Sequence, residues 1–298
     1  MGYINVFLSK PCRIFVKNRQ LVVEGETDNS FPIEDLNSVL IESGECSVTS
    51  TALRSLADAG VVLFICDEKH LPNGVMLPFN AYYRPLKTLE LQLSISKPKQ
   101  KQLWQSIVKQ KINNQATCLA LCCKEQESKY LFDLAKRVNS DDAKNTEATA
   151  ANYYFKKLFG SDFERRNDNF INSVLNYGYT IVRGLIARTL AVYGFETSIG
   201  LHHVNQLNNF NLADDIIEPY RPVVDLIAYS MTEYDEFTPE IKKILFNLIN
   251  QDVKINGQIH ALSYATELTV QSLKVCFEKD NSEIMLPELL PLGTHRYE

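Results

Sequence analysis

Near residue 80 the spacing of the apolar residues changes from that of strands to that of helices. Before this point, short β-branched and aromatic runs alternate with turn residues, at Ile4–Leu8, Arg13–Val16, Leu21–Glu24 and Val61–Cys66. After it, apolar residues recur three and four apart, first at Leu86, Leu89 and Leu93. Side chains on a strand alternate between two faces, whereas those on one helix face recur about every 3.6 residues. We therefore expect an α+β protein of two domains: a small antiparallel β-domain over residues 1–80, a linker over 81–90 and a larger all-α domain over 91–298.

Capping and turn residues predict several individual elements. Thr49 or Ser50 would cap a helix over Thr51–Asp58. Asp168 would cap the longest apolar helix, over Phe170–Tyr193. The Asn256-Gly257 pair between strand-like residues is typical of a two-residue hairpin. Apolar stripes indicate further helices that start at Pro98 and Ser140 and that span Tyr130–Val138, Pro239–Leu248 and Leu262–Phe277.

The charged residues are unevenly distributed. The chain has a formal net charge of −5, which argues against a protein that coats nucleic acid nonspecifically. Residues 81–140, however, carry 11 Lys and Arg against 4 Asp and Glu. This basic segment could supply contacts to phosphates, or it could simply form a pair of solvated helices.

Features of membrane and secreted proteins are missing from the sequence. No apolar run approaches the roughly 20 residues of a membrane-spanning helix, and the first ten residues do not resemble a signal peptide. The seven cysteines include no C-x-x-C pair, and Cys118, Cys122 and Cys123 fall at helical spacing. This pattern is typical of reduced thiols, so we expect a cytoplasmic protein with no membrane partner.

The residues best suited to metal binding or catalysis lie between Gly200 and Asp225. Asn211 is a suitable N-cap for a helix starting at Leu212. On that helix Glu218 lies four residues after Asp214 and three after Asp215, so the three carboxylates would share a face. Like charges at this spacing repel one another unless a cation lies between them, which favours a hard metal ion. Pro219 and Pro222 would then break the helix just after Glu218.

Two adjacent histidines, His202 and His203, precede these carboxylates. Neighbours on an extended segment point in opposite directions, so one of the two is expected to be structural. A histidine with several carboxylates suits Mn²⁺ or Mg²⁺ better than structural zinc, and such sites act on phosphates. No G-x-S-x-G motif indicates a serine hydrolase. The residues alone therefore indicate metal-dependent phosphoryl transfer or hydrolysis, with nucleic acid as one candidate substrate. A structural histidine and a solvated Glu147 remain alternatives.

Three segments, in the same order, resemble one known family. Residues 202–225 read H-H-x-N-x-x-N-x-F-N-L-A-D-D followed by E-P-Y-R-P-x-V-D, residues 147–155 form a Glu-Ala helix ending in Tyr-Tyr-Phe, and residues 31–36 read FPIEDL. This pattern is similar to that of the CRISPR-associated spacer-acquisition integrase and endonuclease family, in its type II-like form. The resemblance covers nearly the whole chain. It implies an N-terminal β-domain that dimerises and a C-terminal helical catalytic domain.

The resemblance also implies a set of active-site residues. By motif position, the metal-binding and catalytic residues are Glu147, His203 and Glu218, with Mg²⁺ or Mn²⁺ as the cofactor. Asp215 is kept as a possible further ligand or as a group supporting one. The implied reaction inserts short spacer DNA into the CRISPR repeat array, by attack of a 3′-hydroxyl on a phosphodiester. With water as the nucleophile, the same site would be an endonuclease. The alternative from another class is a noncatalytic DNA-binding scaffold of the acquisition complex.

Partners follow from the same resemblance. We expect double-stranded DNA, both as spacer fragment and as CRISPR repeat, a homodimer, and a 4:2 heterohexamer with the small second CRISPR-associated protein. The residues expected to contact DNA are Lys99, Lys101, Lys109, Lys111, Asn205, Asn208 and Arg221.

Overall fold

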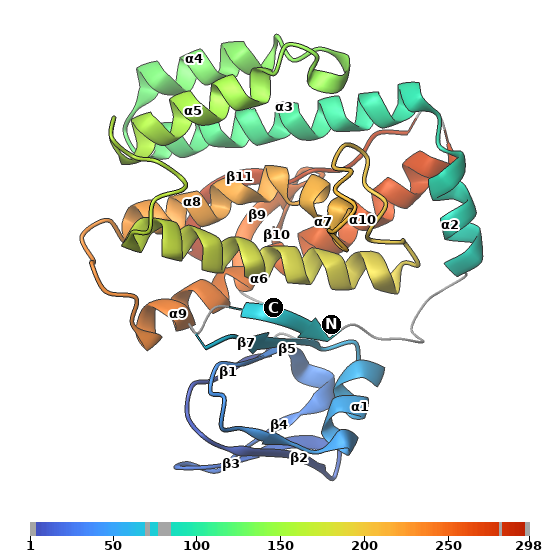
Figure 1. Cartoon of the computed structure of the whole chain (residues 1–298), viewed down its shortest axis with the longest axis vertical. Helices are drawn as coiled ribbons and strands as arrows, with labels where there is room; N and C mark the ends of the chain where they lie inside the picture. Colours follow the sequence, from blue (N-terminus) through green and yellow to red (C-terminus); the bar gives the residue numbers. More distant parts are fainter. Residues whose placement is uncertain (1–3, 69–71, 77–84, 280–281, 296–298) are drawn as a thin grey trace.

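The computed structural model describes residues 4–68, 72–76, 85–279 and 282–295. Its N-terminal part contains two four-stranded sheets, and its C-terminal part is mainly helical (Figure 1). The chain is thus a mixed α+β protein with a strand-rich N-terminal region, as the change of apolar spacing predicts. No helix in the described ranges is long and apolar enough to cross a membrane.

The first sheet has the order β1-β5-β7-β8, made of Ile4–Leu8, Leu36–Ile41, Val62–Cys66 and Pro72–Met76. Strand β5 pairs in parallel with both β1 and β7, and only β8 runs antiparallel. Helix α1 (Ser50–Asp58), capped by Thr49 as predicted, lies in the connection from β5 to β7. Such a helical crossover permits parallel pairing. The prediction of an antiparallel domain is therefore wrong for this sheet, since it treated neighbouring strands in sequence as hairpins.

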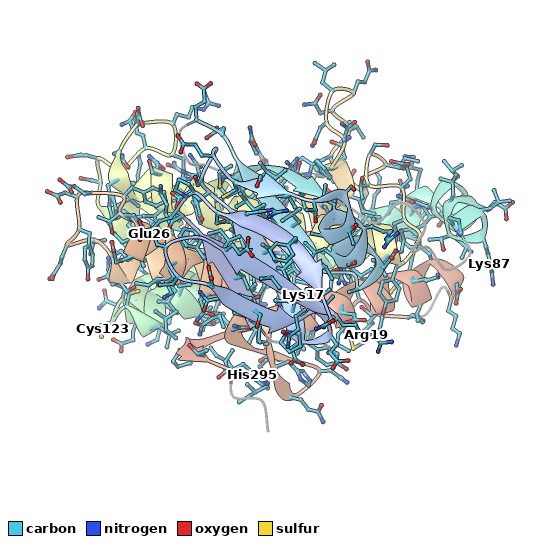
Figure 2. The ribbon with its side chains drawn as sticks, turned by 90° about the horizontal axis from the view of Figure 1, so that it is seen from below. Lys17, Arg19, Glu26, Lys87, Cys123 and His295 are labelled. Atoms are coloured by element: carbon cyan, nitrogen blue, oxygen red, sulfur yellow. The ribbon has the colours of Figure 1, made fainter. Side chains whose placement is uncertain are left out.

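The second sheet lies at the end of the molecule opposite the helices of the C-terminal part, with α1 beside it, and fills the centre of the view in Figure 2. Its order is β4-β3-β2-β6, made of Asn29–Pro32, Gln20–Glu24, Arg13–Lys17 and Ser47–Val48. Strands β2, β3 and β4 are antiparallel, as expected, whereas β6 joins β2 in parallel. Lys17 and Arg19, labelled in Figure 2, lie at the turn between β2 and β3 on this outer sheet.

The helices form the upper layers of Figure 1. They are α2 (Pro85–Ser94), α3 (Lys97–Leu121), α4 (Glu125–Ala135), α5 (Thr146–Phe159), α6 (Phe170–Val192), α7 (Asn211–Ile216), α8 (Arg221–Ser230), α9 (Pro239–Phe246) and α10 (Leu262–Glu278), with short 3₁₀ turns η1 (Ile33–Asp35), η2 (Ser140–Asp142), η3 (Glu218–Tyr220) and η4 (Asn247–Asn250). Helix α6 is the most buried, as its apolar sequence predicts, although Asn169 rather than Asp168 caps it. Residues 85–90 of the predicted linker belong to α2, and residues 81–84 lie outside the described ranges.

The C-terminal part also contains a sheet, so the prediction of an all-α domain is wrong. Strands β9 (Gln251–Ile255), β10 (Gln258–Ala261) and β11 (Glu288–Thr294) form a sheet of order β10-β9-β11. The predicted hairpin is confirmed: β9 and β10 are antiparallel, and both residues of the Asn256-Gly257 turn have positive φ, at 51° and 79°. Strand β11 comes from the tail, where proline and glycine obscure the strand pattern.

One hydrophobic core continues from the first sheet into the helices. Leu40, Val62 and Phe64 of that sheet belong to the same buried cluster as the helical core. The Phe64 ring packs against Gly184 of α6 so closely that an added Cβ would overlap it. A buried ion pair between Glu42 and Lys242 of α9 adds a polar contact across the same boundary. The first sheet is therefore packed onto the helices as part of one body.

Candidate active site

Helix α3 carries the residue around which the predicted site residues gather. Lys111 is buried, its side chain is 9% exposed, and its Nζ lies 2.5 Å from Glu147 Oε1 and 2.5 Å from Glu218 Oε2. Glu147 comes from α5, and Glu218 comes from η3. The two glutamates, which are far apart in the sequence, thus meet at one ammonium group. Among the described residues these two carboxylates are the hydrogen-bond and ion-pair partners of Lys111.

Local capping fixes Glu147 at the start of its helix. Asp142 accepts hydrogen bonds from the backbone N–H groups of Thr146 and Glu147, each at 2.9 Å. Asn145, with a positive φ of 52°, turns the chain into α5. The helix therefore begins at Thr146 rather than at Ser140 as predicted, and Glu147 stands in its first turn, where a carboxylate is favoured by the helix dipole.

Glu218 lies between two cations at the break between α7 and α8. Burial alone would raise the pKa of Glu218, but Arg221 and Lys111 outweigh burial and lower this pKa to about 2. Arg221 Nε donates to Glu218 Oε1 at 2.9 Å. The Lys111 ammonium lies 2.5 Å from the buried Oε2, which is therefore ion-paired. The predicted break after Glu218 is present as the η3 turn.

Asp215 organises the segment of residues 200–210, which we call the histidine loop. Its carboxylate is fully buried and accepts the backbone N–H groups of Leu201 at 2.5 Å and of His202 and His203 at 3.1 Å. The ring of His203 is also bound, with Nδ1 2.7 Å from Asp215 Oδ1. Gly200 makes this close approach possible, because a Cβ there would overlap the His203 carbonyl oxygen.

His203 is held by Asp215 in the orientation of a ligand. The hydrogen bond to Asp215 raises the pKa of His203, against the opposing effect of burial, and the charge of Glu218 raises it further. A carboxylate at Nδ1 fixes the tautomer and leaves Nε2 as the nitrogen for a ligand. The His203 side chain is 43% exposed. Glu218 and His203 are thus within electrostatic reach of each other.

Trp104 of α3 supports the two histidines. The ring of His202 stacks on the indole at 4.2 Å between centroids and 2° between planes, and His203 meets it edge-on at 5.8 Å. Trp104 and Lys111 are seven residues apart, so they share a face of α3. The expectation that one of the paired histidines is structural agrees with the stacked His202. The role of Trp104 was not predicted, since a buried tryptophan on a helical stripe resembles any core residue.

The carboxylates of α7 do not share one cation, contrary to the prediction from their spacing. Asp214 forms an ion pair with Arg183, its Oδ1 2.6 Å from Nε, while Asp215 faces the histidine loop and Glu218 faces Lys111. Within the described residues, no group of three or more His, Cys, Asp or Glu side chains is positioned to hold a metal ion. The Lys111 ammonium stands between Glu147 and Glu218.

Two of the four lysines predicted to follow DNA phosphates point inward. Lys99 is buried and donates to the Ser282 carbonyl, and Lys111 is bound to the glutamates. Because both side chains are buried and bind groups inside the protein, their positions do not favour the predicted DNA contact. Lys101 is 48% exposed and pairs with Asp141, and Lys109 lines a surface hollow between α3 and α4. Helical spacing alone could not separate these two pairs.

The three other predicted contact residues have internal partners. Asn205 and Asn208 bind within the histidine loop: Asn205 Oδ1 accepts the Leu207 N–H, and Asn208 Nδ2 donates to Asp214. Arg221 binds Glu218 and lies over the Tyr179 ring, 4.5 Å from its centroid. Asn211 is the first residue of α7 rather than its cap, and its side chain donates to the Ser198 carbonyl. These groups shape the loop and the site wall.

Two comparisons with known sequences agree with each other. The profile of the family described as "CRISPR associated protein Cas1" matches residues 6–245. The chain is 40% identical over 305 aligned residues to the CRISPR-associated endonuclease Cas1 of Neisseria meningitidis serogroup C (strain 8013), an alignment that spans 100% of both chains.

Two solved structures share the fold. A casposase bound to integration product matches with a TM-score of 0.78 at 21% identity, covering 95% of this chain and 92% of that one. A chain of a Cas6-RT-Cas1–Cas2 complex matches with a TM-score of 0.70 at 20% identity, covering 93% of this chain and 35% of that one. The profile match and the full-length identity together show that this chain belongs to the Cas1 family of CRISPR-associated proteins.

Proposed function

We propose that this protein is a metal-dependent DNA integrase that inserts short spacer DNA into the CRISPR repeat array. The observation that carries the proposal is the meeting of Glu147 and Glu218 at one buried cationic position, next to a histidine whose Nδ1 is held by a carboxylate. The family membership and the likeness to an integration-product complex support it. With water as the nucleophile, the same site would act as an endonuclease.

The donor set fits the divalent ion that we propose. Glu147, His203 and Glu218 would hold Mg²⁺ or Mn²⁺, because carboxylate oxygens and one imidazole suit these hard ions. Arg221 binds Oε1 of Glu218, so Oε2, which pairs with the Lys111 ammonium, is the oxygen that would bind the ion. The bound ion would polarise a phosphoryl oxygen and lower the pKa of the attacking hydroxyl. We assign Asp215 to holding His203 rather than to the ion, since its two oxygens already accept four bonds.

The other residues of the site bind and orient. Asp215 keeps the proton of His203 on Nδ1, so that the Nε2 lone pair is free for ligation. Arg221 fixes one oxygen of Glu218 and so orients the other. Lys101 and Lys109 are exposed enough to contact duplex phosphates, and we retain them as DNA-binding residues. Asn205 and Asn208 would contribute by holding the histidine loop.

The proposed partners follow the family. We propose that the protein binds the spacer fragment and the repeat as double-stranded DNA, forms a homodimer and assembles as a 4:2 heterohexamer with Cas2. A solved relative of the same fold is part of a Cas6-RT-Cas1–Cas2 complex, which supports a Cas2 partner. The full-length Neisseria match supports the type II-like form. Since chromosomal DNA is the proposed target, we propose a cytoplasmic location.

A strand-transfer assay tests the function. The full-length protein with Cas2 receives a repeat-bearing plasmid and a fragment with either a free or a blocked 3′-hydroxyl, with and without Mn²⁺. We expect joining only with the free hydroxyl and the ion. Glu147→Gln should abolish joining and keep DNA binding, whereas Glu240→Gln, an exposed glutamate in the first turn of α9, is the matched control.

Two other results would redirect the assignment. Joining at the wild-type rate by both Glu147→Gln and His203→Ala would indicate a noncatalytic DNA-binding scaffold. Cleavage of branched DNA that proceeds equally well without a repeat sequence would indicate a general repair nuclease. The first result is recognised by the amount of joined product, and the second by the dependence of cleavage on the repeat sequence.

A further inference from the structure

Lys111 is a cation that the chain itself places where we propose the metal ion. Its ammonium lies 2.5 Å from one oxygen of each proposed glutamate ligand, and within the described ranges the lysine has no other ion-pair partner. We infer that Lys111 competes with the divalent ion for Glu147 and Glu218, so that the ion binds as the ammonium withdraws. The inference rests on the proposed metal site and adds a positioning residue to it.

The charges around Lys111 make simultaneous occupancy unfavourable. Glu147 and Glu218 carry two negative charges, and Lys111 and Arg221 balance them within the cluster. Two carboxylate oxygens at 2.5 Å make the charged ammonium the form of Lys111 that fits this buried position. A divalent ion between the same carboxylates would meet this buried charge at short range, where the dielectric does little to screen repulsion.

The Lys111 ammonium can move away from Glu147 and Glu218 without a change of fold. Lys111 stands in the middle of α3, whose backbone is fixed by its own hydrogen bonds and by the buried residues around it. The ammonium sits at the end of a flexible four-carbon stem, in contrast to the planar fork of arginine. Rotation of the stem can therefore release both carboxylates while α3, α5 and η3 stay in place.

Mn²⁺ binding to the full-length protein, measured by calorimetry, tests the competition. Lys111→Met removes the charge and keeps the length, and we expect its Kd for Mn²⁺ to fall by about tenfold or more, the factor that corresponds to one charge-assisted hydrogen bond. Without added divalent ion the same variant should melt below wild type, because two carboxylates lose their counter-charge. Mn²⁺ should then raise its Tm by more than it raises that of wild type.

Control variants separate this inference from the proposed function. Lys97→Met, at an exposed lysine in the first turn of α3 and outside the cluster, should bind Mn²⁺ as wild type does. Lys111→Gln carries the same expectation as Lys111→Met and replaces it if the methionine variant does not fold. Mn²⁺ binding by Lys111→Met and Lys111→Gln that is equal to or weaker than wild type overturns the competition.

A further variant tests the metal site on its own. Glu218→Gln should lose Mn²⁺ binding if the metal site is correct. Loss in Glu218→Gln together with unchanged binding in Lys111→Met removes only the inference about Lys111. Unchanged binding in Glu218→Gln removes the proposed site and the inference with it.

Discussion

Replacing Asp215 by asparagine tests whether this buried carboxylate sets both the shape of the histidine loop and the tautomer of His203. The carboxylate accepts two backbone N–H groups on Oδ2 and one backbone N–H plus His203 Nδ1 on Oδ1. An asparagine has one acceptor oxygen and one NH₂ group. If its oxygen serves Leu201 and His202, its NH₂ group faces the two donors of His203, and both of these hydrogen bonds are lost.

The expected cost follows from those two hydrogen bonds. Each is charge-assisted and contributes about 1.5–3 kcal/mol. Because the His203 ring is 43% exposed and can turn toward water, part of the loss is recovered, and we expect destabilisation of about 3 kcal/mol. For a chain of 298 residues, whose unfolding entropy is about 0.6 kcal/mol/K, that corresponds to a fall in Tm of roughly 5 °C. His203 would also shift its proton to Nε2 so that Nδ1 can accept from the asparagine, which removes the ligand lone pair. Mn²⁺ affinity should fall by about 10–100-fold.

Thermal unfolding and Mn²⁺ titration measure the two effects separately. Asp214→Asn is the matched control, because it changes a neighbouring carboxylate on α7 that pairs with Arg183 and has no hydrogen bond to His203. We expect it to lower the Tm by less and to leave Mn²⁺ affinity unchanged. An Asp215→Asn variant whose Mn²⁺ affinity and Tm match those of Asp214→Asn would refute the role assigned to Asp215.

Three further predictions concern other parts of the molecule. Burial raises the pKa of Asp225 to about 6, against the hydrogen bonds from Tyr179 and Tyr154. The folded protein therefore binds a proton at Asp225 more tightly than the unfolded chain does. The resulting stabilisation is present in full below about pH 4 and is lost as pH rises through 6, so the unfolding free energy of the wild type should fall by about 3 kcal/mol between pH 4 and 7. In Asp225→Asn this fall should be absent. Gly184→Ala should destabilise by about 1–3 kcal/mol in chemical denaturation, because the methyl group overlaps the Phe64 ring; unchanged stability would contradict the close packing. Lys109→Ala should weaken binding to duplex DNA and reduce the slope of log K against log salt by about one, whereas a slope equal to that of wild type would remove Lys109 from the interface.

The sequence predicts the elements better than it predicts their pairing. Alternation and turn residues are local signals, so the β9–β10 hairpin and α1 with its Thr49 cap are confirmed. The parallel pairing of β5 with β1 and β7 depends on contacts between distant segments and on the position of α1, which no local pattern records. Strand β11 was missed for a related reason, since it is stabilised by β9 rather than by its own composition.

The same distinction between local signals and contacts of distant segments applies to the candidate site. The spacing of Asp214, Asp215 and Glu218 correctly locates a charged cluster, but it cannot show that each carboxylate has a separate partner. Lys111 is the clearest case. In the sequence it is one of several lysines on a basic helix, and only the packing of α3 against α5 and η3 makes it the counter-charge of two glutamates.

The contact between Phe64 and Gly184 links the first sheet to the histidine loop through helix α6. Arg183 precedes Gly184 on α6, and its guanidinium donates hydrogen bonds to Asp214 and Asn208. These two residues support the histidine loop. Strand β7 and the residues that hold the histidine loop therefore contact adjacent residues of α6, Gly184 and Arg183.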